Sequence, residues 1–258
     1  MRLFKIIALL LFSFWLVACA YHRNNDTVFP YQYQPELAKN SNIQRIMIVP
    51  VNYGVPSRHY LQAHEPFIDQ QAAKYLQEAG YKTIPDKSFS SLWKKKILEY
   101  GEPYNPSTGK MSNMYAEMLQ ASLTKLFEQN PTLDAVLFTD LIEEPLRFEK
   151  EGSKHASWSG VSRNIRTERI AYGEEAGITQ NLTLQGVSIE LHLLNRNGAL
   201  VHHSRGGIQI IQSLELNNTK GKVRRRKDLL QDEEEIEEGI RLALHPFIVM
   251  EDYPARAK

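Results

Sequence analysis

The chain contains almost no cysteine: Cys19 is the only one among its 258 residues. A disulfide within the chain is therefore excluded, and so is a zinc site built from several thiolates. Apolar residues make up 42% of the sequence, which is enough for a sizeable core. We expect the packing of these residues, without covalent cross-links, to stabilise the fold.

Long apolar stretches are also missing. The run that stands out, Ile6–Val17, covers 12 residues, whereas a membrane-spanning helix needs about 20. Arg2 and Lys5 precede it, and the small residues Ala18 and Ala20 follow it. A basic start, a short apolar segment and small residues at its end are typical of a secretory signal peptide.

The last residues of this segment, Leu16-Val17-Ala18-Cys19, resemble the bacterial lipobox. In lipoproteins, the thiol receives a diacylglycerol, the signal is cut before the cysteine, and the new amino terminus is acylated. Several acyl chains hold a protein on a membrane almost permanently. We therefore predict a signal peptide at residues 1–18 and lipid attachment at Cys19. The alternative is an incidental cysteine at the end of an ordinary signal peptide.

Net charge indicates no particular partner, because 31 Lys and Arg residues face 30 Asp and Glu residues. We also expect no nucleic-acid partner, because the compartment to which the protein is exported holds no nucleic acid to bind. One local exception is the basic run Lys222–Lys227. It is either a solvated loop, partly balanced by the acidic segment 232–238, or a contact for lipid phosphates.

Hydrophobic periodicity predicts one α/β domain at residues 43–250, with a mixed sheet and flanking helices in the order β-α-β-α-α-β-β-β-α. A polar tether, residues 19–42, precedes it, and a short tail, residues 251–258, follows. Ile46 and Ile48 are expected on one face of the first strand, with Met47 and Val49 on the other. The expected elements are strands at Arg45–Val51, Tyr81–Asp86 and Asp134–Ile142, helices at Phe67–Ala79, Asp86–Tyr100 and Asn113–Gln129, a hairpin within Leu184–Ile211, and a last helix with its apolar face at Ile236–Phe247.

No catalytic or cofactor motif is evident. Ser159 lacks the glycine and the strand-turn-helix setting of a nucleophile elbow, and it lies in a polar excursion, Lys150–Leu182, for which we expect a hairpin. His192, His202 and His203 gather on the predicted hairpin, where His192 and His202 are expected to face each other. Zinc needs three or four converging ligands, and no carboxylate spacing completes a set. We therefore expect no catalytic residue, metal or cofactor.

Loop residues are the candidates for binding a partner. Tyr53, Arg58 and Tyr60 follow the first predicted strand, and Trp158 and Arg163 lie in the excursion. Tyr, Trp and Arg dominate interface hot spots, and binding residues often lie on loops that a rigid scaffold positions. For Trp158, a buried position against the sheet is an equal alternative.

The segments "RIMIVPV", "FIDQQAAKYLQEAGYKTIPD", "LDAVLFTDL" and "VSIELHLLNRNGALVHHSRGG" together resemble a family of bacterial envelope lipoproteins. Its members include the curli-secretion lipoprotein, the lipoprotein activators of penicillin-binding proteins, the GNA-type putative lipoproteins and the amino-terminal domain of the Tol-system propeller protein. The resemblance implies an α/β core similar to an anticodon-binding domain. It also implies a binding or assembly module, with an envelope protein as partner and a possible homo-oligomer.

These observations favour a lipid-anchored periplasmic module that binds another envelope protein. The residue after Cys19 is Ala20. An Asp at this position would favour retention in the inner membrane. We therefore predict that the protein is anchored in the outer membrane, with the inner membrane as the alternative. Two other functions stay open: an oligomeric secretion or pore-associated subunit, and a hydrolase of cell-wall material whose cleft is shaped by Lys150–Leu182. An enzyme should show a pocket with converging polar groups, and a binding module should show an exposed apolar patch.

Overall fold

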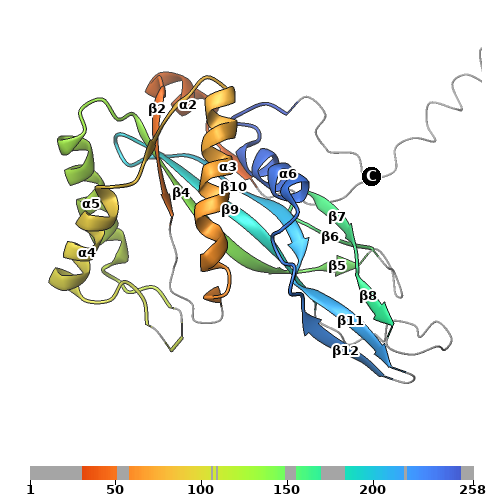
Figure 1. Cartoon of the computed structure of the whole chain (residues 1–258). Coiled ribbons are helices and arrows are strands. Elements are labelled where there is room, and N and C mark those ends of the chain that lie inside the picture. Colours follow the sequence, from red (N-terminus) through yellow and green to blue (C-terminus); the bar gives the residue numbers. More distant parts are fainter. Residues whose placement is uncertain are drawn as a thin grey trace, which may run out of the picture.

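The computed structural model of the chain describes residues 31–50, 58–105, 107–108, 110–148, 155–169, 184–217 and 220–250. A six-stranded mixed sheet forms the centre, in the strand order β1-β10-β9-β4-β2-β3 (Figure 1). Strand β2 runs parallel to β3 and β4, and the remaining neighbours are antiparallel. The predicted α/β class with a mixed sheet is therefore confirmed. The strands are β1 (Tyr31–Tyr33), β2 (Arg45–Pro50), β3 (Lys82–Pro85), β4 (Ala135–Pro145), β9 (Gln185–Asn195) and β10 (Leu200–Ile210).

Helices cover both faces of this sheet, so the domain has three layers (Figure 1). Helices α3 (Glu65–Glu78) and α6 (Glu233–Leu244) pack on one face, and α4 (Phe89–Tyr100) and α5 (Tyr115–Gln129) pack on the other. Asp232 is the N-cap of helix α6, because its carboxylate accepts hydrogen bonds from two backbone amides of the first turn. None of the helices in the described ranges is long and apolar enough to cross a membrane.

Strand β2 is buried on both faces, as the sequence predicted. Ile46 and Ile48 belong to the core beneath α3 and α6, whereas Met47 and Val49 belong to the core beneath α4 and α5. None of the four is more than 6% exposed. This strand therefore joins the two cores, which is why it carries an almost wholly apolar sequence.

Part of the predicted tether has regular structure. Strand β1 pairs with the outer edge of β10, with Tyr31 opposite Ser204 and Tyr33 opposite His202. The short helix α2 (Pro35–Ser41) follows it. The sequence of these three residues gives no strand pattern. They form a strand because the outer edge of β10 offers backbone groups that are otherwise unpaired.

Two small three-stranded sheets extend the domain beyond the central sheet (Figure 1). One confirms the hairpin expected in the excursion. The other places Lys222–Arg225 of the basic run in a strand, whereas a solvated loop was one of the two interpretations of that run. That strand forms because it pairs residue by residue with its neighbour, Leu214 facing Val223. The strands of the first sheet are β5 (Arg147–Phe148), β6 (His155–Trp158) and β7 (Val161–Asn164); those of the second are β8 (Thr167–Arg169), β11 (Gln212–Asn217) and β12 (Lys220–Arg225).

Candidate functional site

Charged and imidazole side chains occupy two adjacent cross-strand rows of the central sheet, next to the area that α4 and α5 cover. In the first row, Asp140 of β4, Glu190 of β9 and Arg205 of β10 lie side by side. In the next row, His192 of β9 and His203 of β10 are partners. We call these five residues the polar cluster. Such a set on a sheet face beside a hydrophobic core is a candidate functional site, because ionisable groups with shifted pKa values gather at functional sites.

A β-bulge decides which histidine joins this cluster. The register of β9 and β10 shifts between Leu200 and His202, so one residue, Val201, has no partner. The shift pairs His192 with His203 and turns His202 to the opposite face, where its Nε2 contacts the carbonyl oxygen of Ala243 on α6 at 2.8 Å. The expectation that His192 and His202 face each other was wrong, because a one-residue shift moves every following side chain to the other face.

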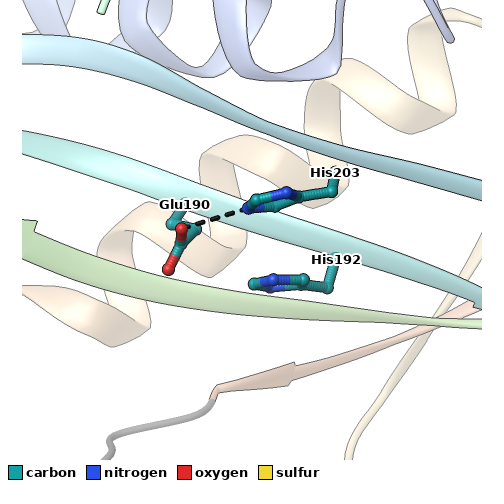
Figure 2. A group of neighbouring side chains, drawn as sticks. All are labelled: Glu190, His192 and His203. Atoms are coloured by element: carbon teal, nitrogen blue, oxygen red, sulfur yellow. Dashed lines mark hydrogen bonds and ion pairs between the residues drawn. The ribbon is translucent and has the colours of Figure 1, made fainter. Parts of the chain in front are cut away.

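Glu190 connects the two rows (Figure 2). Its Oε1 accepts hydrogen bonds from Nε of Arg205 at 2.7 Å and from Nε2 of His203 at 3.1 Å. The imidazole rings of His192 and His203 are stacked, with centroids 4.2 Å apart and planes 10° from parallel. Figure 2 shows both rings reaching toward the Glu190 carboxylate. The cluster therefore holds one carboxylate and two imidazoles in a fixed arrangement.

The surroundings set the charge of each member. Burial raises the pKa of Glu190, but the hydrogen bonds from His203 and Arg205 outweigh it and bring that pKa down to about 2. Burial, aided by the nearby His203, lowers the pKa of His192 to about 4. At neutral pH Glu190 is thus ionised and His192 is neutral, so His192 offers a nitrogen lone pair.

Asp140 is the acid of the cluster whose ionisation is least favoured. Burial raises its pKa to about 7, with Arg58 opposing this and Glu190 adding to it. Arg58 donates one hydrogen bond to Oδ2 of Asp140 at 3.0 Å and another to the carbonyl oxygen of Leu141 at 2.8 Å. Asp140 and Glu190 lie directly opposite each other on neighbouring strands. Like charges in this arrangement repel each other.

The candidate binding residues of the first loop are used within the fold. Arg58 holds Asp140, as described above. The hydroxyl of Tyr60 donates to Oε1 of Glu143 at 2.7 Å, and the guanidinium of Arg225 lies 3.7 Å from the centre of its ring. The next arginine of the basic run, Arg226, binds Asp228. Cys19 and Tyr53 lie outside the described residues.

The candidates in the excursion also make internal contacts. Trp158 is 4% exposed and fills space directly beside Gly186 and Gly207, so of the two positions considered for it the structure shows the buried one. Arg163 donates to the carbonyl oxygen of Ile208 at 3.2 Å and to Glu238 of α6 at 2.6 Å. These contacts attach the β6–β7 hairpin to β10 and α6.

Ser159 has a carboxylate as its neighbour. It lies in the turn between β6 and β7 with a positive φ of 36°, and its hydroxyl donates to Oε2 of Glu144. The same carboxylate accepts from Ser188 and pairs with Arg205. A serine nucleophile is activated by an adjacent base, usually a histidine, whereas the hydroxyl of Ser159 contacts a carboxylate that it shares with two other residues.

Exposed apolar side chains occur where the sequence analysis named no candidate. On α4, Leu98 is 87% exposed and Tyr100 is 39% exposed; in the following loop, Met111 is 62% exposed. The exposed residues Lys94 and Lys95 precede them on the same helix. The signal was present in the sequence, because Leu98 falls outside the apolar stripe that Phe89 and Trp93 begin. Lys94 and Lys95 lie four and three residues before Leu98, so the three side chains are neighbours on the helix surface, and we call Lys94, Lys95 and Leu98 the α4 surface.

Comparisons with known proteins gave low similarity. No family model and no curated protein matches the chain. A PelC dodecamer from Paraburkholderia phytofirmans, carrying a leucine-to-methionine substitution, aligns with 11% identity and a TM-score of 0.34, over 90% of this chain and 99% of that one. The PelC dodecamer in a second crystal form gives 12% identity and a TM-score of 0.31, over 71% and 81%. Lipoprotein GNA1162 from Neisseria meningitidis gives 15% identity and a TM-score of 0.30, over 73% and 90%. TM-scores this low establish neither a shared fold nor a shared function.

Proposed function

We propose that the protein is a lipoprotein of the bacterial envelope, anchored in the outer membrane through Cys19, that binds another envelope protein without catalysing a reaction. The observation that carries the proposal is the lipobox-like sequence Leu16–Cys19 at the end of a short apolar segment. Tyr31, the first residue of β1, is the twelfth residue after Cys19. A chain of this length reaches at most about 40 Å when fully extended, so a lipid on Cys19 keeps the domain close to its membrane.

The position of β1 determines which side of the domain lies farthest from the anchor. Strand β1 is one edge of the central sheet and β3 is the other. Five strand spacings of about 4.8 Å separate them, roughly 24 Å in total. Helices α4 and α5 cover the end of the sheet near β3, where Ile84 packs into their core. Helix α4 lies on the β2 side of the sheet, away from β10 (Figure 1), and β1 pairs with β10.

The α4 surface combines apolar and basic groups. Leu98 is a large aliphatic side chain left almost entirely exposed, and the exposed Lys94 and Lys95 lie within one turn of it. Exposing such a side chain leaves about 1.5–3 kcal/mol of hydrophobic free energy unused. The matching partner is a protein with an apolar pocket bordered by carboxylates, because such a surface takes up Leu98 and attracts both lysines.

The experiment is site-specific photocrosslinking in cells that express the full chain. A photoreactive amino acid at position 98 should crosslink a discrete envelope protein, and one at position 249 should not. Val249 is the matched control, since it is also a strongly exposed aliphatic residue, at 73%, but follows α6. Leu98→Asp should abolish co-purification of that partner, while Val249→Asp should retain it. Retention by Leu98→Asp would contradict the α4 surface as the binding site.

Two further outcomes separate the alternatives. A crosslink from position 98 to a second copy of the chain would favour the homo-oligomeric secretion or pore-associated subunit. Cys19→Ser should release the protein from the membrane fraction on cell fractionation. If the Cys19→Ser protein still partitions with the outer membrane as the wild type does, the lipid anchor is refuted.

A further inference from the structure

Glu190, His192 and His203 place three metal-ligating groups next to one another (Figure 2). Each offers one ligand atom, a carboxylate oxygen or an imidazole nitrogen, and these atoms all lie within 4.8 Å of one another. The three residues belong to the paired strands β9 and β10, so the sheet backbone fixes their relative positions. A site built on strands is held more accurately than one built on loops.

The distances are close to those of a bound ion. Zinc binds imidazole nitrogen and carboxylate oxygen at about 2.0–2.2 Å in tetrahedral geometry, so two ligand atoms of one ion are about 3.4 Å apart. The side chains of Glu190, His192 and His203 therefore need to close by at most about 1.4 Å, which small rotations of the side chains can supply. The side chain of His203 is 25% exposed, which leaves it room to rotate and leaves solvent a path to the site.

The imidazole of His192 is available as a ligand. It stacks on His203 but makes no hydrogen bond to another residue within the described ranges. Its ring is half-buried and lies on the same face of the sheet as Glu190 and His203. The ligand nitrogen of His192 lies within 4.8 Å of the ligand atoms of Glu190 and His203, so it can bind an ion that these two residues also contact.

We propose that Glu190, His192 and His203 bind a divalent transition-metal ion of the zinc class, with a fourth position open to water. Two imidazoles and one carboxylate suit zinc and its neighbours better than magnesium or calcium, which prefer oxygen ligands alone. On binding, the ion replaces the proton through which Nε2 of His203 now contacts Oε1 of Glu190. Arg205 keeps its hydrogen bond to Oε1, and the second carboxylate oxygen is left for the ion. The positive charge of Arg205 opposes the ion, while the carboxylates of Asp140 and Glu144 favour it.

The test is a zinc titration of the full chain in detergent, freed of metal with a chelator and carrying no histidine tag. Isothermal titration calorimetry should show one Zn²⁺ per chain. His192→Ala and His203→Ala should each weaken this binding by about 100-fold or more, since changes even in the outer shell of metal sites cost 10–100-fold. His155→Ala, which removes an exposed histidine of β6, should leave it unchanged. Circular dichroism checks that each variant is folded.

A second variant separates a metal site from a purely structural cluster. Arg205→Gln removes the positive charge next to Glu190, so zinc affinity should rise by about tenfold. If the cluster only stabilises the sheet, the protein should show no stoichiometric zinc binding. Arg205→Gln should then lower the melting temperature and have no other effect. Two results overturn the proposal: wild-type protein that binds no Zn²⁺, and binding that is equally strong in both the His192→Ala and the His203→Ala proteins.

Discussion

Gly206 of β10 and Gly239 of α6 bring a strand and a helix into direct backbone contact. A Cβ atom on Gly206 would overlap the carbonyl oxygen of Gly239, and it would also crowd the backbone nitrogen of Ala243 at 2.9 Å. Neither neighbour is a flexible side chain that can move aside. The close approach of α6 to the sheet therefore depends on the missing side chain at Gly206.

Gly206→Ala is expected to lower the free energy of unfolding by at least about 2 kcal/mol, because overpacking against a rigid backbone forces the helix away from the sheet. Gly239→Ala is the matched control. A Cβ atom at Gly239 would lie 2.7 Å from Cγ1 of Ile208 and 2.9 Å from the carbonyl oxygen of Gly207, which is a weaker overlap than at Gly206. Alanine also raises helix propensity by about 1 kcal/mol, so Gly239→Ala should lose less stability than Gly206→Ala. Urea unfolding followed by circular dichroism measures both. Equal losses in the two variants would contradict the backbone contact at Gly206.

Trp158→Ala is expected to destabilise the domain by about 3–5 kcal/mol, the usual cost of emptying a buried aromatic site. Its indole fills the space that Gly186 and Gly207 leave between β9–β10 and the β6–β7 hairpin. Phe148→Ala, at a position that is 37% exposed, should cost less than about 1 kcal/mol. A Trp158→Ala protein that melts like the wild type would show that the tryptophan does not support this packing.

Ile48→Asp is expected to prevent folding. Ile48 is 6% exposed in the core beneath α3 and α6, and an unpaired carboxylate buried there costs several kcal/mol, comparable with a total stability of about 5–15 kcal/mol. Ile48→Val should fold and lose only about 0.5–1.5 kcal/mol. The two are compared by expression in soluble form and by thermal melting. A cooperative melting transition in the Ile48→Asp protein would remove β2 from the core.

Asp69 of α3 is expected to make the protein less stable as the pH rises from about 4 to about 6. Burial raises its pKa from 3.8 to about 6, with a hydrogen bond from Thr139 opposing the shift. The carboxyl group therefore ionises in the unfolded chain first, which favours unfolding across this pH range, and the full penalty remains above pH 6.

Asp69→Asn removes that penalty. At pH 8 the variant should be more stable than the wild type by about 3 kcal/mol, because the pKa of Asp69 rises from 3.8 to about 6 and one pKa unit corresponds to 1.36 kcal/mol. At pH 3.5 the two proteins should be about equally stable. Urea unfolding at both pH values gives the comparison. A gain of the same size at both would mean that the ionisation of Asp69 is not its cause.

Much of the fold followed from local patterns in the sequence. The apolar run at Arg45–Val51 predicted a strand buried on both faces, and β2 has that property. The alternation around "NRNG" predicted the hairpin of β9 and β10. Periodicity of 3.6 predicted α3, α5 and α6 to within a few residues. These elements are predictable because burial of one face or both imposes a repeating pattern of apolar residues.

The candidate site did not follow from such patterns. Glu190 and His192 are two residues apart on one strand, but their partners His203 and Arg205 come from the next strand, and the bulge at Val201 sets the pairing. A bulge has little sequence signature of its own. The loop candidates Arg58 and Arg163 were chosen by residue type, which does not reveal that Asp140 and Glu238 lie within hydrogen-bond distance of them.

The sequence by itself determined which segments form strands and helices, that Cys19 is the single thiol, and that the core is apolar without disulfides. These properties depend on neighbours along the chain. Only the tertiary structure decided that β1 completes the sheet edge, that Trp158 is buried, and that Glu190, His192 and His203 meet. The reason is that strand pairing and side-chain contacts between distant residues depend on register and on backbone approach distances, which local sequence does not encode.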